Sequence, residues 1–317
     1  MILIRTDCYD LAWNLALEYY FSMEKKLGDT VFVLWQADPT VIIGKYQNLR
    51  AEVNLEFTAA NNIAIVRRLS GGGAVYADRG NVMYTYLEPA GEEISFAPYL
   101  SRMQTALRSL GYPAEISGRN DLLAEGRKFS GNSQYIREGM CVHHGTLLYD
   151  SDLGVLERAT TPSQEKLATK GIRSVRERVC NLREFTPERT VEEFVDALAD
   201  ACADGAEKYV LTTEDRVRID ALADELFRGE ETLTGRDPVS TLSRSCRFVG
   251  GELRADLDLR AGILRGVTFS GDIFGDADSL AARLAGIPFT AEAVAAAVKS
   301  SPFPGVTRED LLVLLCP

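Results

Sequence analysis

The sequence predicts an α+β protein, in which a large domain with a mixed or antiparallel sheet packed by helices precedes a small α+β domain. Three strand-like runs between residues 115 and 149 are joined by short turns, and short connections favour antiparallel pairing. A mainly helical stretch at 151–228 follows, and after a break near residue 235 an alternating strand pattern begins again. We therefore place the domains at 1–239 and 240–317.

The first part of the large domain mixes helices with short strands. Residues 11–23 carry apolar side chains at helical spacing, with Asp10 as the expected N-cap. Short β-branched runs predict strands at 30–35, 40–44, 63–69 and 81–87. The last two runs flank a glycine segment, and the turn residues at 78–81 predict that they form a hairpin. A second helix is expected at 96–110, ending before Gly111.

The later elements show the same kinds of signal. Strands are expected at 115–124, 127–137 and 140–149, separated by turn residues. Within the helical stretch, Thr190 and Glu193 have the spacing of a capping box. In the small domain, apolar residues alternate from 253 to 259, and Ala261-Gly262 then predicts a hairpin turn.

Composition limits the functional classes. The 317 residues are 46% hydrophobic, and 35 basic against 46 acidic side chains give a net charge of −11. Such a chain is not expected to bind nucleic acid or an anionic membrane surface. It lacks an apolar run of membrane-spanning length and the layout of a signal peptide. Six scattered cysteines without a CxxC pair predict reduced thiols in a cytoplasmic protein.

The segment RRLSGGGAVYADRGN, residues 67–81, places three glycines shortly after two arginines. Glycine lets backbone N–H groups approach a ligand closely, and successive N–H groups can form an anion-binding concavity. Arg67 and Arg68 end a strand, so their side chains point to opposite faces and only one can face the glycines. The alternative is a glycine bulge in a twisted sheet with two surface arginines. This segment alone favours neither interpretation.

A second polar segment spans residues 117–135. On a strand that begins at Arg127, the side chains of Lys128 and Ser130 share one face, which continues through two amides. Asn120 and Asp121 lie on the preceding run, and a hairpin would bring them near Lys128. A lysine, an acid and an amide beside a glycine turn suit a nucleotide phosphate or an activated carboxylate. A solvated strand face is the alternative.

The adjacent His143 and His144 are the only histidines, which excludes a histidine-rich metal site. They point to opposite faces of a strand, and a half-buried structural histidine is the common explanation for either one. Cys141 shares a face with His143, so a Cys-His nucleophile pair is a rival hypothesis. The basic run at 166–185 predicts either a solvated helix face or a mobile cationic lid that closes on phosphates or docks an acidic partner.

These segments, in this order, resemble the lipoate–protein ligase A family of the biotin/lipoate ligase superfamily. RRLSGGGAVYADRGN is similar to the family's RR-x-SGGGAV-[FY]-H-D-x-GN motif, and GRNDLLAEGRKFSGNSQY to its GRND…K-x-SG-[NS] motif. HHGTLL, KGIRSVRERVCNL and TVIIGKYQN also have counterparts, and SGDIFGDADSLAARLAG resembles a segment of the accessory domain. Each motif is weak alone, but the colinear set is very specific and spans most of the chain.

The resemblance implies a biotin/lipoate ligase-like fold and an acyl-adenylate mechanism. Lipoate and ATP, with Mg²⁺, would give lipoyl-AMP and pyrophosphate, and a lysine of a lipoyl acceptor domain would then take the lipoyl group. The implied acceptors are the E2 subunits of 2-oxoacid dehydrogenases or the glycine cleavage H protein. The ligase is expected to act as a monomer.

Carried over residue by residue, the resemblance makes Lys128 the catalytic residue, in contact with both lipoate and the nucleotide phosphate. The implied ATP and adenylate site comprises Arg68, Gly73, Ala74, Val75, Tyr76, Asn120, Asp121 and Lys128. The implied lipoate site comprises Ser70, Lys128 and His144. The segment 171–181 matches a loop that folds over the adenylate, and the resemblance assigns no metal ligands.

Two other functions stay open. One is an ATP-independent octanoyl or lipoyl acyltransferase of the same fold, with Cys141 as its nucleophile. The other is a non-catalytic lipoate-binding protein, because Ala77 stands where the family pattern has histidine. That replacement would shift the acyl preference or lower the activity, whereas the retained Lys128, both arginines and the basic run argue against loss of function.

Overall fold

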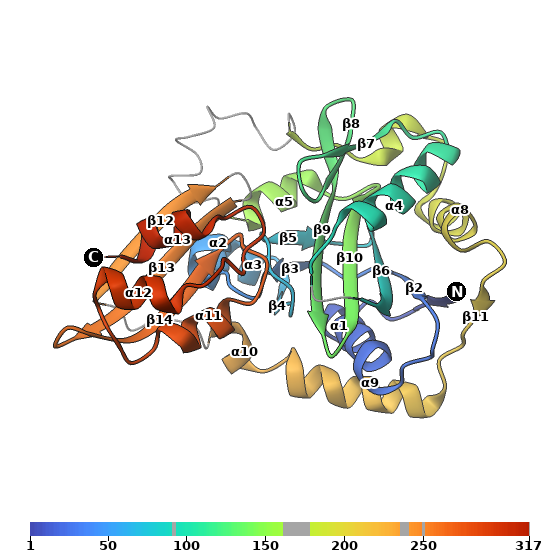
Figure 1. The fold of residues 1–317 in the computed structure, drawn as a ribbon. Helices are drawn as coiled ribbons and strands as arrows, with labels where there is room; N and C mark the ends of the chain where they lie inside the picture. The colour runs from blue at the N-terminus through green and yellow to red at the C-terminus, as the bar shows by residue number, and fades with distance from the viewer. Residues whose placement is uncertain (91–92, 161–177, 235–240, 249–250, 317) are drawn as a thin grey trace.

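The large domain is built on a mixed sheet of eight strands among the residues that the computed structural model describes, namely 1–90, 93–160, 178–234, 241–248 and 251–316 (Figure 1). In spatial order the strands are β11 (Glu207–Lys208), β1 (Ile2–Arg5), β2 (Val31–Trp35), β6 (Asn81–Pro89), β10 (Met140–Leu148), β9 (Arg127–Arg137), β8 (Asp121–Ala124) and β7 (Ala114–Ser117). Only the β11–β1 and β1–β2 pairs among them are parallel. The predicted α+β class and mixed sheet are confirmed.

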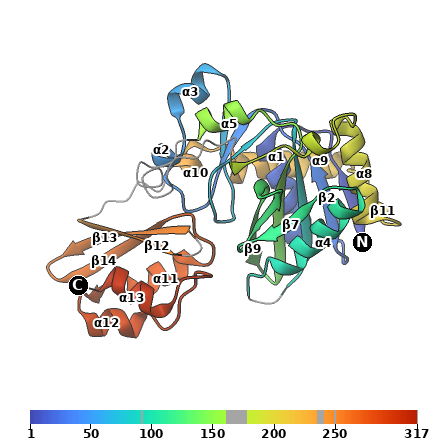
Figure 2. The same cartoon turned by 90° about the horizontal axis from the view of Figure 1, so that it is seen from above.

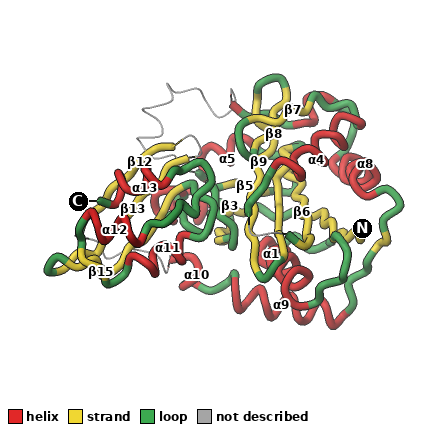
Figure 3. The backbone as a smooth tube through the Cα atoms, viewed as in Figure 1, coloured by secondary structure: helices red, strands yellow, loops and turns green. Residues whose placement is uncertain are grey.

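Helices cover both faces of this sheet, which is why its central strands β2, β6 and β10 are buried along most of their length. One face packs against α1 (Leu11–Tyr19), the π-helical turn η1 (Tyr20–Glu24) and α9 (Thr213–Leu226). The other packs against α4 (Ala97–Ser109) and α8 (Val191–Ala203), with the 3₁₀ turn η2 (Leu182–Phe185) nearby (Figures 1 and 3). Among the described residues, no helix is both long and apolar enough to cross a membrane.

Local signals in the sequence set most of these boundaries correctly. Asp10 caps α1 by accepting the Ala12 N–H at 2.9 Å. Thr190 and Glu193 form the predicted capping box at the start of α8. The predicted run at 115–124 is instead two strands, β7 and β8, because the chain reverses at Gly118, whose φ of +58° favours glycine.

A second, three-stranded sheet contradicts the predicted hairpin of residues 63–69 with 81–87. It contains β4 (Ala64–Arg67), β3 (Thr40–Ile43) and β5 (Val75–Ala77), and β4 pairs in parallel with β3. The expected turn is present, with the Asn81 N–H donating to Asp78, but it leads from β5 into β6 of the large sheet. The hairpin prediction was wrong because the glycine segment carries the chain out of β4 before the turn. Short helices cover this sheet: α2 (Leu49–Glu52), α3 (Leu55–Ala60) and α5 (Leu153–Ala159).

The C-terminal residues form their own antiparallel sheet and core, which stand apart from the large domain in Figure 2. The sheet holds β12 (Leu242–Phe248), β13 (Gly251–Arg260), β14 (Ile263–Gly271) and β15 (Ile287–Pro288), and its helices are α11 (Ala277–Leu284), α12 (Ala291–Ala297) and α13 (Arg308–Leu315). The predicted turn at Ala261-Gly262 joins β13 to β14, with both residues at positive φ. Helix α10 (Glu230–Thr234) precedes residues 235–240, where the predicted boundary lies outside the described residues.

The side chain of Asp215, at the start of α9, ties that helix to the π-helical turn η1 that follows α1. The Lys25 ammonium and the Tyr20 hydroxyl donate to one carboxylate oxygen at 2.5 and 2.9 Å. The Tyr209 hydroxyl and the Thr212 N–H donate to the other at 2.8 and 2.9 Å. Burial alone would raise the pKa of Asp215, but these donors hold it well below its ordinary value.

We expect Asp215→Asn to lower the free energy of unfolding by about 2–3 kcal/mol, because it leaves the Lys25 charge without its partner. Urea denaturation measures this change. Asp196→Asn is the matched control, since its ion pair with Arg5 joins side chains that are 63% and 46% exposed. The control should change stability by less than about 0.5 kcal/mol. Equal effects of the two substitutions would contradict the interpretation.

Candidate functional site

A cavity of about 110 Å³ lies on the α1 side of the large sheet, between that sheet and the glycine segment. Both sheets of the large domain and one residue of the small domain contribute to its wall. The lining residues are Leu15, Trp35, Ile42, Arg68, Gly72, Gly73, Ala74, Val75, Met83, Asn120, Lys128, Gly131, Asn132, Ser133, His144, Gly145, Thr146 and Phe274.

The lining is chemically divided. Leu15, Trp35, Ile42 and Met83 supply apolar surface from α1, β2, β3 and β6. A ligand with an aliphatic arm would bury that arm against these side chains. Polar and cationic groups come instead from the glycine segment, from the turn before β8, and from β9 and β10. The cavity therefore suits a molecule that is apolar at one end and anionic at the other.

Arg68 is the buried cation of the cavity, and its guanidinium holds the glycine segment in shape. Its Nη2 donates to the carbonyls of Gly71 and Gly73 at 2.6 and 2.9 Å, and its Nε donates to Ser70 Oγ at 3.1 Å. Burial lowers the pKa of Arg68 to about 10, which still leaves it charged at neutral pH. Arg67 turns the other way, to carbonyls that include Gly44 and Leu233. The prediction that one arginine alone faces the glycines is confirmed.

The first two glycines of the segment are needed for contact with the small domain. A Cβ on Gly71 would lie 1.8 Å from the carbonyl oxygen of Ile273, and the Gly72 N–H donates to that oxygen at 2.8 Å. Gly72 also has a φ of +89°. By contrast, Gly73 is open, with Asp272 Oδ1 at 3.6 Å from its Cβ position. The segment is therefore not a simple strand bulge, since it lines the cavity and docks the small domain.

Lys128 lies at the more open end of the cavity and pairs with Asp121 at 2.7 Å, with side chains 40% and 33% exposed. The predicted sharing of one face by Lys128 and Ser130 was wrong. Adjacent residues of β8 pair with Lys128 and Ser130, so β9 bulges at Phe129 and the alternation shifts by one. The ammonium consequently lies 3.1 Å from the Cβ position of Gly131.

Two asparagines clamp the turn before β8 to β9. The Asn132 N–H donates to the Asn120 carbonyl at 2.9 Å, and the Asn120 side chain donates back to the Asn132 carbonyl at 2.6 Å. The clamp places Asn120 in the cavity wall and Asp121 beside Lys128. The predicted proximity of Asn120, Asp121 and Lys128 is confirmed.

The sequence matches known protein families and individual relatives over most of its length. Residues 10–203 match the lipoyl protein ligase A/B catalytic domain, and residues 237–315 match the bacterial lipoate protein ligase C-terminus. A Streptococcus pyogenes lipoate–protein ligase is 36% identical over 95% of this chain and 94% of its own length. The lipoate–protein ligase LplJ of Bacillus subtilis is 33% identical over 95% and 96%.

This chain is a member of the lipoyl protein ligase A/B family. Solved structures agree in fold with this ligase-family member. The P. falciparum protein LipL1 in complex with lipoate has a TM-score of 0.80 over 98% of this chain and 97% of its own, at 21% identity. A bipartite lipoate protein ligase of Thermoplasma acidophilum has a TM-score of 0.65 over 76% of this chain and 98% of its own, at 25% identity.

Most predicted site residues of this family member come together. Those in the cavity wall are Arg68, Gly73, Ala74, Val75, Asn120, Lys128 and His144. Ser70 lies behind the cavity wall and forms a hydrogen bond of 2.7 Å with His144. Asp121 does not line the cavity but forms an ion pair with Lys128, which does. The Tyr76 side chain is buried in the core of the smaller sheet, and the residue does not line the cavity. Ala77 is fully buried in the apolar core beneath α1.

The basic run was predicted at 166–185, and the adenylate loop at 171–181. Residues 161–177 lie outside the described residues. The end of the run contacts the site directly, since the Cys180 N–H donates to the Lys128 carbonyl at 3.0 Å.

The rival pair Cys141 and His143 faces α4, away from the cavity lining. Gln134 donates to the fully buried Cys141 sulfur at 2.9 Å, and burial raises the pKa of the thiol. The His143 ring stacks on Tyr99 with centroids 4.2 Å apart, and its Nε2 lies 3.3 Å from Asn132 Oδ1. Neither residue is among the described residues that line the cavity, so the structure brings no cysteine nucleophile to it.

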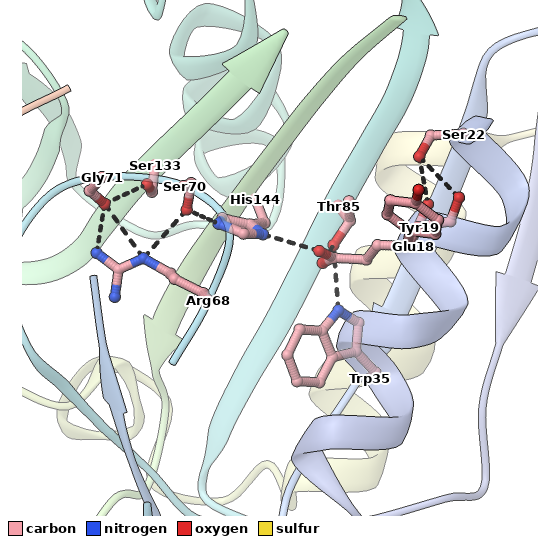
Figure 4. A network of polar contacts seen from close by, with 10 residues as sticks. All are labelled: Glu18, Tyr19, Ser22, Trp35, Arg68, Ser70, Gly71, Thr85, Ser133 and His144. Carbon is pink, nitrogen blue, oxygen red and sulfur yellow. Dashed lines mark hydrogen bonds and ion pairs between the residues drawn. The ribbon is translucent and has the colours of Figure 1, made fainter. Parts of the chain in front are cut away.

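The site holds residues that the sequence did not single out: the apolar lining of Leu15, Trp35, Ile42 and Met83, and the side chains of Phe274 and Glu18. Phe274 of the small domain lines the cavity, lies under the Arg119 guanidinium at 4.5 Å and meets the Phe96 ring edge-on at 5.2 Å. Glu18 of α1 bonds to His144 from behind the wall (Figure 4). One signal was available, because Glu18 is the only charged residue between Leu11 and Met23.

We expect His143→Gln to weaken the pH dependence of stability. Burial lowers the pKa of His143 well below its ordinary value, so below pH of about 6.5 the unfolded chain binds a proton that the folded chain does not. Wild-type stability should therefore fall by up to about 1.4 kcal/mol per pH unit from this group as the pH drops. Chemical denaturation between pH values of about 6.5 and 5.5 should show a smaller loss in the variant. An unchanged slope would contradict the burial argument.

Proposed function

We propose that this chain activates lipoate with ATP, forming lipoyl-AMP and pyrophosphate, and then transfers the lipoyl group to a lysine of a lipoyl acceptor domain. One observation carries the proposal: a single cavity joins an apolar end to an end with two cations, Arg68 and Lys128. The apolar end suits the alkyl arm and dithiolane of lipoate, and the cationic end suits a carboxylate facing a phosphate.

Lys128 is the proposed catalytic residue, and its role is electrostatic. In the first step a lipoate carboxylate oxygen attacks the α-phosphorus and pyrophosphate leaves. Two unit charges about 4 Å apart repel by roughly 4 kcal/mol at an effective dielectric of about 20. An ammonium between them offsets this repulsion and stabilises the charge that develops during transfer. Lysine is a compact charge on a flexible stem, so it can contact oxygens of both groups.

The proposed nucleotide site uses Arg68 together with the backbone of 73–76 and the Asn120–Asp121 turn. Backbone without bulky side chains lets the adenylate approach closely. The described residues contain no group of three acidic, histidine or cysteine side chains that could hold a metal. Mg²⁺ would therefore enter mainly on phosphate and water oxygens, with Asp121 the nearby carboxylate. Bound there, it would neutralise phosphate charge.

Lipoate would lie along Leu15, Trp35 and Met83, with its carboxylate toward Lys128. His144 lines the same cavity and Ser70 supports it from behind, so both are proposed to position the lipoyl group. In the second step, the acceptor lysine nitrogen attacks the acyl carbon and AMP leaves. The exposed side of Lys128 and Asp121 is the open route for that lysine.

The acceptor is proposed to be an E2 subunit of a 2-oxoacid dehydrogenase or a glycine cleavage H protein. The T. acidophilum relative was solved as a lipoylation system with its E2 lipoyl domain, which supports an acceptor of this class. We further propose a cytoplasmic monomer with domains at 1–239 and 240–317. The division is supported by cores that lie on either side of the proposed boundary and share only Tyr46 and Phe274 across it among their described buried residues.

Lys128→Ala should lower the rate of lipoyl-AMP formation by about 10²–10³, because it removes the charge that offsets the approach of two anions. Lipoate-dependent ATP–pyrophosphate exchange measures this step. Arg127→Ala is the neighbouring control, since Arg127 pairs with Glu184 in a partly exposed ion pair at 2.8 Å. A Lys128→Ala enzyme with a near-normal rate would exclude the electrostatic role.

Cys141→Ser should retain ATP-dependent lipoylation of an acceptor domain, because the buried thiol does not line the cavity. Mass spectrometry of the acceptor, with and without ATP, measures the reaction. Transfer from an acyl-carrier donor without ATP, lost in Cys141→Ser, would support the acyltransferase instead. Lipoate binding without any acceptor modification would support the non-catalytic protein.

A further inference from the structure

Glu18 is a buried carboxylate that the proposed reaction does not use directly. It belongs to α1 and is only 1% exposed, although α1 otherwise buries mainly apolar side chains against the sheet. A buried charge is costly unless hydrogen bonds satisfy it. The residue therefore needs a structural or functional reason for its position.

Both oxygens of Glu18 have partners, and these partners connect it to two residues of the cavity wall, Trp35 and His144 (Figure 4). The Thr85 hydroxyl donates to Oε1 at 2.5 Å, and this hydroxyl in turn accepts the indole N–H of Trp35 at 3.1 Å. Oε2 lies 2.9 Å from His144 Nδ1. Trp35 belongs to the apolar part of the cavity wall, whereas His144 leads toward the glycine segment.

The network continues from His144 to the buried guanidinium. His144 Nε2 lies 2.7 Å from Ser70 Oγ, and Ser70 Oγ accepts from Arg68 Nε at 3.1 Å. Arg68 then donates to the carbonyl of Gly71, which also accepts from Ser133 Oγ at 2.8 Å. One continuous set of hydrogen bonds therefore runs from α1 to the glycine segment.

The donors and acceptors assign the protons along this path. The Thr85 hydroxyl donates its only proton to Oε1 of Glu18. A carboxylate has no proton to donate, so Oε2 accepts and His144 donates from Nδ1. Ser70 already accepts from Arg68, so its hydroxyl proton is free to point at His144 Nε2. His144 is then neutral, with Nδ1 protonated and Nε2 accepting. A doubly protonated ring would direct a second donor at Ser70, beside the Arg68 cation.

We propose that Glu18 is a positioning residue that fixes the tautomer of His144 and, through Ser70, the placement of Arg68 at the cationic end of the cavity. Thr85 supports Glu18 and couples it to Trp35 at the apolar end. The inference deepens the proposed ligase function and rests on it for its kinetic consequence. The tautomer itself is a property of the protein alone.

The first test is the tautomer, read by NMR of protein labelled with ¹⁵N-histidine. The chain has only two histidines, and a His143→Gln variant assigns them. In wild type, His144 should show a pyrrole-type Nδ1 and a pyridine-type Nε2. His143 should show the opposite pattern, because its Nε2 faces the side-chain oxygen Oδ1 of Asn132. A His144 ring protonated at Nε2, or at both nitrogens, would overturn the proposal.

Glu18→Gln tests whether Glu18 is what fixes the His144 tautomer. Glutamine replaces one of the two carboxylate oxygens by an NH2 group. It therefore cannot accept from Thr85 at one end and from His144 at the other. We expect a changed His144 pattern, and kcat/KM for lipoate in ATP–pyrophosphate exchange should fall about 10- to 100-fold, as when an orienting partner is removed. KM for the acceptor domain should stay within about twofold, because the relay does not reach the exposed end of the site.

Ser22→Ala is the matched control, one turn further along the chain in the π-helical turn η1 that follows α1. Ser22 is equally buried and bonds to the Glu18 backbone carbonyl at 2.6 Å, outside the relay. It should keep the His144 tautomer and the lipoate kinetics of wild type. Thr85→Val provides a second, isosteric break if Glu18→Gln does not fold, and it should lower kcat/KM for lipoate less than Glu18→Gln.

The outcomes separate this inference from the proposed function. An unchanged tautomer and unchanged lipoate kinetics in a folded Glu18→Gln enzyme would overturn the positioning role and leave the ligase function intact. A wild-type protein that forms no lipoyl-AMP, yet shows the expected tautomer and its loss in Glu18→Gln, would overturn the ligase function alone.

Discussion

The site depends on the hydrogen bonds that the buried guanidinium of Arg68 makes with the glycine segment. A cation without water must be surrounded by acceptors, and the backbone of the glycine segment supplies two carbonyls while Ser70 supplies a hydroxyl. In meeting this need the segment takes one defined path. On that path the segment forms part of the cavity wall, and Ser70 lies against His144. The charge and the shape of the site thus have a common origin.

The same path explains why the site needs a second domain. A Cβ on Gly71 would collide with the carbonyl oxygen of Ile273, and a Cβ on Gly72 would meet the Phe274 ring. This contact brings Phe274 over the cavity, where its ring joins apolar side chains of the large domain. Gln47 adds a hydrogen bond to Asp272 at 3.2 Å, and Lys45 pairs with Asp278 at 2.8 Å. A small apolar anchor and a few polar contacts therefore complete a wall that the large domain leaves open.

Prediction from sequence worked where the signal was local. Helix α1 and its Asp10 cap, the capping box of α8, and strands β9 and β10 depend on nearby residues and were predicted closely. Prediction failed where the structure depends on pairing between strands that are far apart in the sequence. The hairpin of 63–69 with 81–87 did not form because β4 pairs with β3. The face of Lys128 was assigned wrongly because a bulge at Phe129 depends on the pairing of β9 with β8.

By itself the sequence determined the α+β class, the family motifs and the residue types that carry charge. Periodicity, turn chemistry and motif order can be read from residues that are close together in the chain. It also identified Arg68, Lys128 and Asn120 as candidates for one site. Only the tertiary structure decided which arginine faces the glycines, that Cys141 points to another core, and that Glu18 and Phe274 belong to the site. Those outcomes depend on burial and on contacts between residues far apart in the chain, and no local pattern encodes them.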